Sequence, residues 1–211
     1  YAVAVMRRNV PLLLEKPVSI SQTQLDRLQE AAKDNAAGVV ISFPLRYTAQ
    51  VQEMRKILAS GALGRIVQIQ AVNNVPYGRV YFKSWYRDET LTGGLFLQKA
   101  THDVDYIDYL MGCEPVQVCA MDSKIVMTGE HPAQKVCAEC EEAQTCPESI
   151  YRIKHVYMDP YTDDSWRLFG CSYAVDTGNH DCASLILRYP GGAHCVYTQN
   201  FLSRHQALKR G

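Results

Sequence analysis

Val10-Pro11-Leu12-Leu13-Leu14-Glu15-Lys16-Pro17 is the stretch that decides the fold class of this chain. Its apolar part, 10–14, is short and continuous, which is typical of a buried strand in a parallel sheet. A helix is predicted from Ser21, because Ser21 and Gln24 form a capping box ahead of an amphipathic stretch. The next apolar run, 39–43, predicts a second strand. Strand, helix and strand at this spacing indicate a parallel βαβ unit.

Two charged side chains follow the first predicted strand directly. Glu15 and Lys16 stand where that strand ends. In open α/β sheets, ligands bind outside the carboxyl ends of the strands. We therefore expect this position to belong to a binding site.

Residues 92–112 predict a helix whose polar face is unusual for a solvent-exposed helix. At about 100° per residue, one arc is apolar, and the other carries an imidazole, an amide, an ammonium, a carboxylate and two phenols. These polar residues are Gln98, Lys99, His102, Asp105, Tyr106 and Tyr109. Such a face is typical of the wall of a polar cavity, although a partly exposed helix with a hydrogen-bonded histidine would show the same pattern.

The later part of the chain has a different strand pattern. Strands are predicted at 66–72 and 116–126, and 182–201 reads as two strands joined by the turn Pro190-Gly191-Gly192. No periodicity is visible over 127–165. The chain should therefore begin as parallel α/β structure and continue as a mostly antiparallel sheet.

Composition excludes several classes of partner. The 211 residues carry 22 Lys and Arg against 22 Asp and Glu, which gives no sign of a nucleic acid or an anionic membrane as partner. No run reaches the roughly 18 apolar residues of a transmembrane helix, and no signal segment opens the chain. We expect a cytoplasmic protein. Because Tyr1 opens in the middle of a pattern, without a methionine, we also expect a further segment upstream.

Two motifs together resemble the signatures of a known family. Leu14-Glu15-Lys16-Pro17 is similar to the Glu-Lys-Pro signature of the glucose–fructose oxidoreductase / inositol dehydrogenase (Gfo/Idh/MocA) family. Trp85-Tyr86-Arg87, followed by Gly93-Gly94 and by His102-x-x-Asp105, resembles that family's second signature. The two motifs occur in the family's order and on the expected elements.

The resemblance implies a two-domain α/β architecture. Residues 1–45 would be the remnant of an NAD(P)-binding Rossmann domain. Residues 46–211 would form an incomplete α+β domain, with a large, mostly antiparallel sheet and a Cys-rich insertion at about 127–165. Family members move hydride between NAD or NADP and a hydroxyl-bearing carbon of a sugar or polyol, and they often form homo-oligomers through the sheet.

The resemblance also assigns roles to individual residues. Lys16 and His102 would be the catalytic pair, with the imidazole as general acid/base and the ammonium beside the developing alkoxide. The cofactor would lie against 15–17, that is Glu15, Lys16 and Pro17. The substrate would meet Arg87, Gln98, Lys99 and Asp105.

Departures from the family pattern support a second hypothesis. The Gly-rich dinucleotide fingerprint is absent from these residues, and Gln98 stands where many members carry a carboxylate. Lys99 instead resembles a subgroup with a lysine three residues before the histidine. The alternative to a dehydrogenase is a truncated, inactive member that acts as a binding or assembly module.

The eight cysteines fall into two groups. The close spacing of Cys137, Cys140 and Cys146 is typical of a metal site, and resemblance to a Cys-rich subgroup of the family adds Cys171 as fourth ligand of a closed structural zinc site. His131 competes as that ligand, and reduced thiols or a disulfide are the alternatives. The other four, predicted to be small core residues, are Cys113, Cys119, Cys182 and Cys195.

Overall fold

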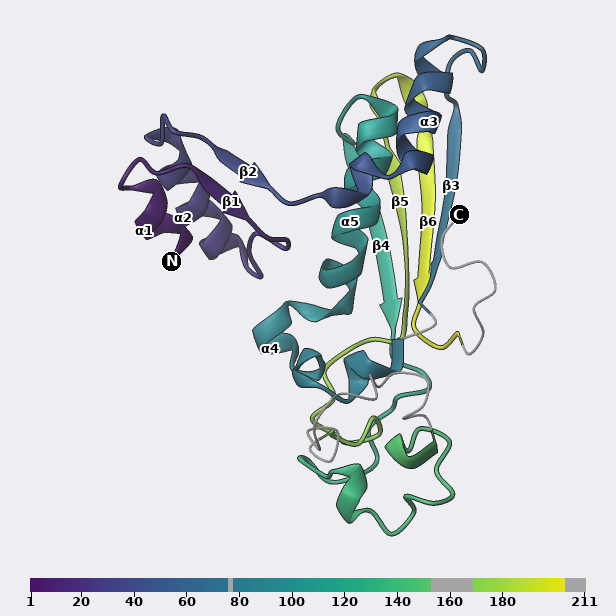
Figure 1. Ribbon diagram of the computed structural model, residues 1–211. Coiled ribbons are helices and arrows are strands. Elements are labelled where there is room, and N and C mark those ends of the chain that lie inside the picture. Colours follow the sequence, from purple (N-terminus) through teal and green to yellow (C-terminus); the bar gives the residue numbers. More distant parts are fainter. Residues whose placement is uncertain (76–77, 153–168, 204–211) are drawn as a thin grey trace. The chain divides into compact units, whose positions relative to one another are not determined.

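The structure is a computed structural model that describes residues 1–75, 78–152 and 169–203 (Figure 1). The chain divides into two compact units. The first comprises Tyr1–Ile66 and Leu97–Glu114, and the second Val67–Phe96 and Pro115–Gly211. The first unit takes in more of the chain than the predicted segment 1–45. Part of the predicted Cys-rich insertion, 153–165, lies outside the described residues.

The first unit contains the predicted βαβ arrangement. Strand β1 (Leu12–Leu14) pairs in parallel with β2 (Val39–Ile41), and α2 (Gln22–Lys33) connects them. One half of the predicted capping box forms at the start of α2, where the Gln24 N–H donates to Ser21 Oγ (3.3 Å). The Gln24 side chain accepts from the N–H of Ile20 (3.1 Å), one residue before the N-cap, and not from that of Ser21. A short helix, α1 (Ala2–Met6), precedes β1.

The chain leaves β2 through a helical connection and returns to the first unit in a long helix. The Ser42 N–H donates to Leu14 O (2.8 Å), which continues the pairing of the strands beyond β2. The 3₁₀ turn η1 (Pro44–Tyr47) and helix α3 (Ala49–Ala59) follow. The helix predicted over 92–112 is α5 (Gly94–Met111). It begins at Gly94 because the preceding helix, α4 (Glu89–Thr92), ends at Gly93 in the left-handed conformation (φ 73°).

The second unit is built on a four-stranded mixed sheet (Figure 1). Its strands are β3 (Gln68–Asn74), β4 (Gln117–Ser123), β5 (Cys182–Arg188) and β6 (His194–Asn200), in the order β3-β6-β5-β4. Strand β3 runs parallel to β6, and the other pairs are antiparallel. The predicted hairpin of β5 and β6 is confirmed, with η6 (Pro190–Gly192) at its turn.

Strands β5 and β6 bury every second side chain. In β5, Leu185 and Leu187 are buried, whereas Ile186 between them is 48% exposed. Every residue of β4 is exposed, so the prediction that Cys119 is a core residue is wrong. The prediction holds for Cys195, which β6 buries completely; Cys113 and Cys182 are partly buried.

A core cluster and three 3₁₀ turns complete the described part of the second unit. The turns are η2 (Gly78–Phe82), η3 (Trp85–Arg87) and η4 (Cys137–Glu139). The cluster is fully shielded from solvent at Phe82, Leu95 and Phe201. It joins residues that lie far apart in the sequence and packs η2 and η3 against Phe201, just after β6.

Asp181 ties three strand ends of the second unit together. Its side chain is completely buried, and Oδ2 accepts hydrogen bonds from the backbone N–H groups of Ile125, Val126 and Met127 at 2.9, 2.6 and 3.1 Å. Its own N–H donates to Ser123 O at the end of β4, and its carbonyl accepts from the Phe201 N–H after β6. Hydrogen bonds from N–H groups to a charged carboxylate stabilise the fold more than those to a neutral acceptor.

We expect Asp181→Asn to lower the free energy of unfolding by about 1–3 kcal/mol, because the amide is a weaker acceptor and adds an unsatisfied buried donor. Chemical denaturation measures this loss. The control is Asp122→Asn, since the Asp122 side chain is 63% exposed, and its effect should stay within about 0.5 kcal/mol. Equal losses in the two variants would contradict this role of Asp181.

Candidate functional site

Lys16 lies at the carboxyl end of β1 and reaches the helix α5. Its Nζ donates a hydrogen bond to the backbone carbonyl of Gln98 (3.1 Å), and the side chain is partly buried. Burial lowers the pKa of Lys16, the nearby ammonium of Lys99 lowers it further, and the carboxylate of Glu15 opposes both. Pro17 follows through a cis peptide bond. The structure therefore brings Glu15, Lys16, Gln98 and Lys99 together, and their roles in a site stay a prediction.

His102 lies one turn beyond Gln98 on α5. Its ring and the ring of Phe43 form an edge-to-face pair, with the centroids 6.3 Å apart and the planes at 82°. Phe43 comes two residues after β2, so both strands send a side chain from their carboxyl ends to the same helix. The imidazole of His102 thus lies one turn of α5 beyond the Gln98 carbonyl that the partly buried ammonium of Lys16 contacts.

Asp105 binds Arg46, a residue that the sequence analysis did not single out. Arg46 Nε and Nη2 donate to the two carboxylate oxygens at 2.8 and 2.6 Å. The guanidinium also lies over the ring of Tyr109, 5.2 Å from its centroid. Arg46 lies in η1, beyond the carboxyl end of β2, and the rule that ligands gather at such ends could have drawn attention to it.

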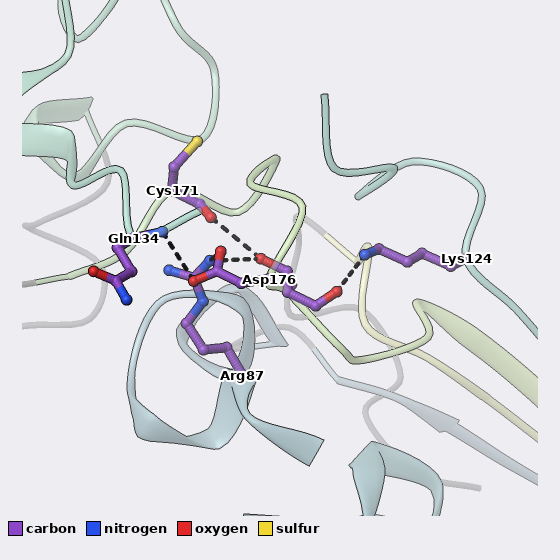
Figure 2. Close-up of polar contacts among 6 residues, drawn as sticks. Arg87, Lys124, Gln134, Cys171 and Asp176 are labelled. Atoms are coloured by element: carbon purple, nitrogen blue, oxygen red, sulfur yellow. Dashed lines mark hydrogen bonds and ion pairs between the residues drawn. The ribbon is translucent and has the colours of Figure 1, made fainter. Parts of the chain in front are cut away.

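Arg87 belongs to the second unit and holds a neighbouring loop of that unit. Figure 2 shows its guanidinium directed at Asp176, with Nη2 donating to Asp176 Oδ1 (2.5 Å) and to Thr177 Oγ1 (2.9 Å). The Gln134 N–H donates to the other oxygen of Asp176 (2.9 Å), and Lys124 Nζ donates to the carbonyl of Thr177. Only 11% of the Arg87 side chain is exposed. These contacts give Arg87 a structural role, and its contact with substrate stays a prediction.

Gly170→Ala should break this arrangement. An added Cβ would lie 1.5 Å from Arg87 Nη1, so the guanidinium would have to leave Asp176. We expect a loss of about 1–3 kcal/mol in the free energy of unfolding, typical of overpacking. Denaturation of both single variants and the double variant measures the coupling. In an Arg87→Ala background most of the loss should disappear, and a loss of unchanged size there would contradict the account.

The four cysteines predicted to bind zinc line one small pocket. Cys137, Cys140, Cys146 and Cys171 share it with Lys83 and Glu148. Within the described ranges, however, no group of three or more His, Cys, Asp or Glu side chains could hold a metal ion. The expected zinc site is therefore not supported: the thiols share a pocket without forming a coordinating group. None of the eight cysteines, all of which lie in the described ranges, forms a disulfide, which agrees with the alternative of reduced thiols.

Lys83 is the member of this pocket that sequence reasoning missed. It is 3% exposed, and its Nζ has no hydrogen-bond partner among the residues that the structure describes. Burial lowers the pKa of Lys83, while Cys137 and Glu148 act in the opposite direction. Burial also raises the pKa of the Cys171 thiol. No sequence pattern distinguishes Lys83 from a surface lysine.

The charges around Lys16 can be tested individually. Lys99→Met should raise the pKa of Lys16, because it removes a neighbouring positive charge, and Glu15→Gln should lower it, because it removes a negative one. NMR titration of ¹³C-methylated lysines reports both changes. Lys56, whose side chain is 75% exposed, is the reference signal and should not move. Unchanged titration of Lys16 in both variants would contradict the electrostatic account.

Most of the chain is similar to known proteins. The GFO/IDH/MocA C-terminal domain matches residues 51–210. The oxidoreductase YteT of Bacillus subtilis is 23% identical over 231 residues, which cover 99% of this chain and 54% of that protein. The myo-inositol 2-dehydrogenase of Thermotoga maritima is 26% identical over 114 residues, 53% of this chain and 32% of that protein. The chain thus spans about half the length of YteT.

Solved structures share the fold. An NAD binding oxidoreductase from Klebsiella pneumoniae has a TM-score of 0.69 at 15% identity, over 99% of this chain and 46% of that one. The myo-inositol 2-dehydrogenase from Lactobacillus plantarum has a TM-score of 0.62 at 17% identity, over 94% of this chain and 47% of that one. At these identities the structures show the fold alone. The family match over 51–210, which covers most of the chain, shows that this chain belongs to the GFO/IDH/MocA family of oxidoreductases.

Proposed function

We propose that this chain is part of an NAD(P)-dependent dehydrogenase that transfers hydride between the nicotinamide and a hydroxyl-bearing carbon of a sugar or polyol. The proposal rests mainly on one observation: Lys16 Nζ donates a hydrogen bond to the carbonyl of Gln98, which lies on α5 one turn before His102. Both residues come from the two motifs that resemble the family's signatures. Several relatives are named inositol dehydrogenases, which favours a polyol substrate.

His102 would act as the general acid/base. Oxidation of a secondary alcohol requires loss of the hydroxyl proton, and an imidazole suits that transfer near neutral pH. The edge-to-face contact with Phe43 restricts the orientation of the imidazole. As the hydroxyl loses its proton, negative charge develops on its oxygen, and the ammonium of Lys16 would stabilise this charge. Lys16 is partly buried, and charges interact more strongly there than in water.

The cofactor would supply the hydride acceptor or donor, and residues 15–17 fit its nicotinamide end. The fit rests on the partly buried Lys16, which lies just beyond the carboxyl end of β1, where ligands of α/β sheets bind. Glu15 is exposed beside it. The Gly-rich loop that holds a pyrophosphate would have to lie outside residues 1–211, because these residues do not contain it.

Among the predicted substrate residues, Lys99 best fits a contact with hydroxyl groups. It is partly exposed and close enough to Lys16 to lower its pKa. Gln98 is 8% exposed. Asp105 and Arg87 are already bound to Arg46 and to Asp176.

A homo-oligomer through the sheet is the proposed assembly. The register places Cys119, Met121 and Ile186 on one face of the sheet. Of these, Met121 is 76% and Ile186 48% exposed. An apolar face of this kind is typical of surfaces that bind a partner.

The role of His102 is tested by His102→Ala in the full-length protein. We expect kcat to fall about 10²–10⁴-fold, the usual contribution of general acid/base catalysis, with cofactor binding retained. Formation of NADH or NADPH, followed by absorbance with myo-inositol and a panel of sugars, measures turnover. The control is His194→Ala, at an exposed position of β6, which should leave turnover unchanged. A fall of less than tenfold for His102→Ala, or no turnover of any polyol or sugar by the wild type, would contradict the proposal.

A further inference from the structure

Arg46 and Asp105 form an ion pair that the proposed chemistry does not use. The pair is bidentate, with distances of 2.8 and 2.6 Å. The Asp105 side chain is 7% exposed, and that of Arg46 is 39% exposed. The hydrogen bonds to the Asp105 carboxylate raise the pKa of the Arg46 guanidinium. Two parallel hydrogen bonds from a guanidinium to a nearly buried carboxylate fix the orientation of one group relative to the other. The contact therefore orients η1, which contains Arg46, against α5, which contains Asp105.

Arg46 is itself held in place at both ends. Its backbone carbonyl accepts a hydrogen bond from Gln52 Nε2 on α3 (2.6 Å). Its guanidinium lies between the rings of Phe43 and Tyr109, 6.0 and 5.2 Å from their centroids. These contacts restrain the position of Arg46, so its ion pair can in turn restrain α5.

The ion pair determines which face of α5 meets the strands. Gln98, His102, Asp105 and Tyr109 follow one another at helical spacing, so rotation of α5 would move all four together. Lys16 contacts the first, Phe43 the second, and Arg46 the third and fourth. The bidentate contact is the only one of these with two directional bonds, and it therefore constrains the rotation most.

We propose that Arg46 is a positioning residue for the reaction: by binding Asp105, it holds α5 at the rotation that presents His102 beside Lys16. This inference rests on the proposed function for its catalytic consequence. It assigns Asp105 to Arg46 and removes it from the set of substrate ligands. Arg46 acts through Asp105 and touches no reacting atom.

The pair also balances the charge next to His102. The charged groups that the first unit places around this stretch are Glu15 and Lys16 after β1, Arg46 after β2, and Lys99, Asp103 and Asp105 on α5 itself. Loss of Arg46 would leave the Asp105 carboxylate unbalanced and favour the imidazolium. Loss of Asp105 would leave the guanidinium unbalanced and disfavour it. Removing Arg46 and removing Asp105 should therefore shift the pKa of His102 in opposite directions. A pair that only held the helix in place would not produce opposite shifts.

The decisive experiment follows the ¹³C signal of His102 through a pH titration of the full-length protein, with the signal assigned by its absence in His102→Asn. We expect the titration midpoint to move up in Arg46→Gln and down in Asp105→Asn, and to return toward the wild-type value in the double variant. The matched control is Arg55→Gln. Arg55 lies over the same Tyr109 ring at 5.2 Å, but its hydrogen bond goes to a carbonyl, Leu110 O, and its loss should leave the midpoint in place. Shifts in the same direction, or none in either variant, would overturn the proposal.

Kinetics of the same variants test the catalytic consequence. We expect Arg46→Gln and Asp105→Asn to lower kcat about 10–100-fold through misplacement of His102, with KM changed much less, because neither residue binds substrate. Arg46→Lys keeps the charge but loses the fork, and should recover only part of kcat. A large rise in KM at unchanged kcat would overturn the assignment. If the wild type turns over no substrate, the proposed function fails alone, because the titration does not depend on substrate and still decides the pairing of Arg46 with Asp105.

Discussion

The parallel pairing of β1 with β2 is the constraint on which the candidate site depends. Parallel strands end at the same edge, so the segments that leave them emerge side by side. Lys16 comes from one and Phe43 and Arg46 from the other, and all three contact α5. The hydrogen bond from the Ser42 N–H to Leu14 O extends the pairing up to these residues. The site is therefore formed by α5 and the two segments that leave β1 and β2, each with its own contact to the helix.

Local patterns were enough to predict most elements of the fold. The capping box at Ser21, the amphipathic period of α5 and the Pro190-Gly191-Gly192 turn are all signals within a few neighbouring residues, and the structure contains each predicted element. The partners of the site residues could not be predicted in this way. Arg46 and Asp105 are 59 positions apart, and no local pattern records which carboxylate a given arginine will meet. The roles of Lys16 and His102 came from a family resemblance, and remain a proposal.

The cysteines show what spacing can and cannot predict. Close spacing predicted that Cys137, Cys140 and Cys146 would lie together, and they line one pocket with Cys171. Spacing carries no information on the direction of each thiol, and in the described residues no metal-binding group is formed. It also gave no sign of Lys83 in the same pocket. Cys119 was misjudged for a related reason: an apolar strand predicts burial only when another layer covers it, and β4 is exposed along its whole length.

The short connection after β1 has a consequence for how this sequence can change. Glu15 is the one residue between the end of β1 and Lys16, and the strand register runs residue for residue from Leu12 with Val39 to Leu14 with Ile41. Because neighbouring side chains of an extended backbone point in opposite directions, deleting or inserting one residue here would turn the ammonium away from α5. The length of this segment is thus constrained more tightly than its composition. A homologous sequence with a gap at this point would keep every residue type of the proposed site and still lack its arrangement.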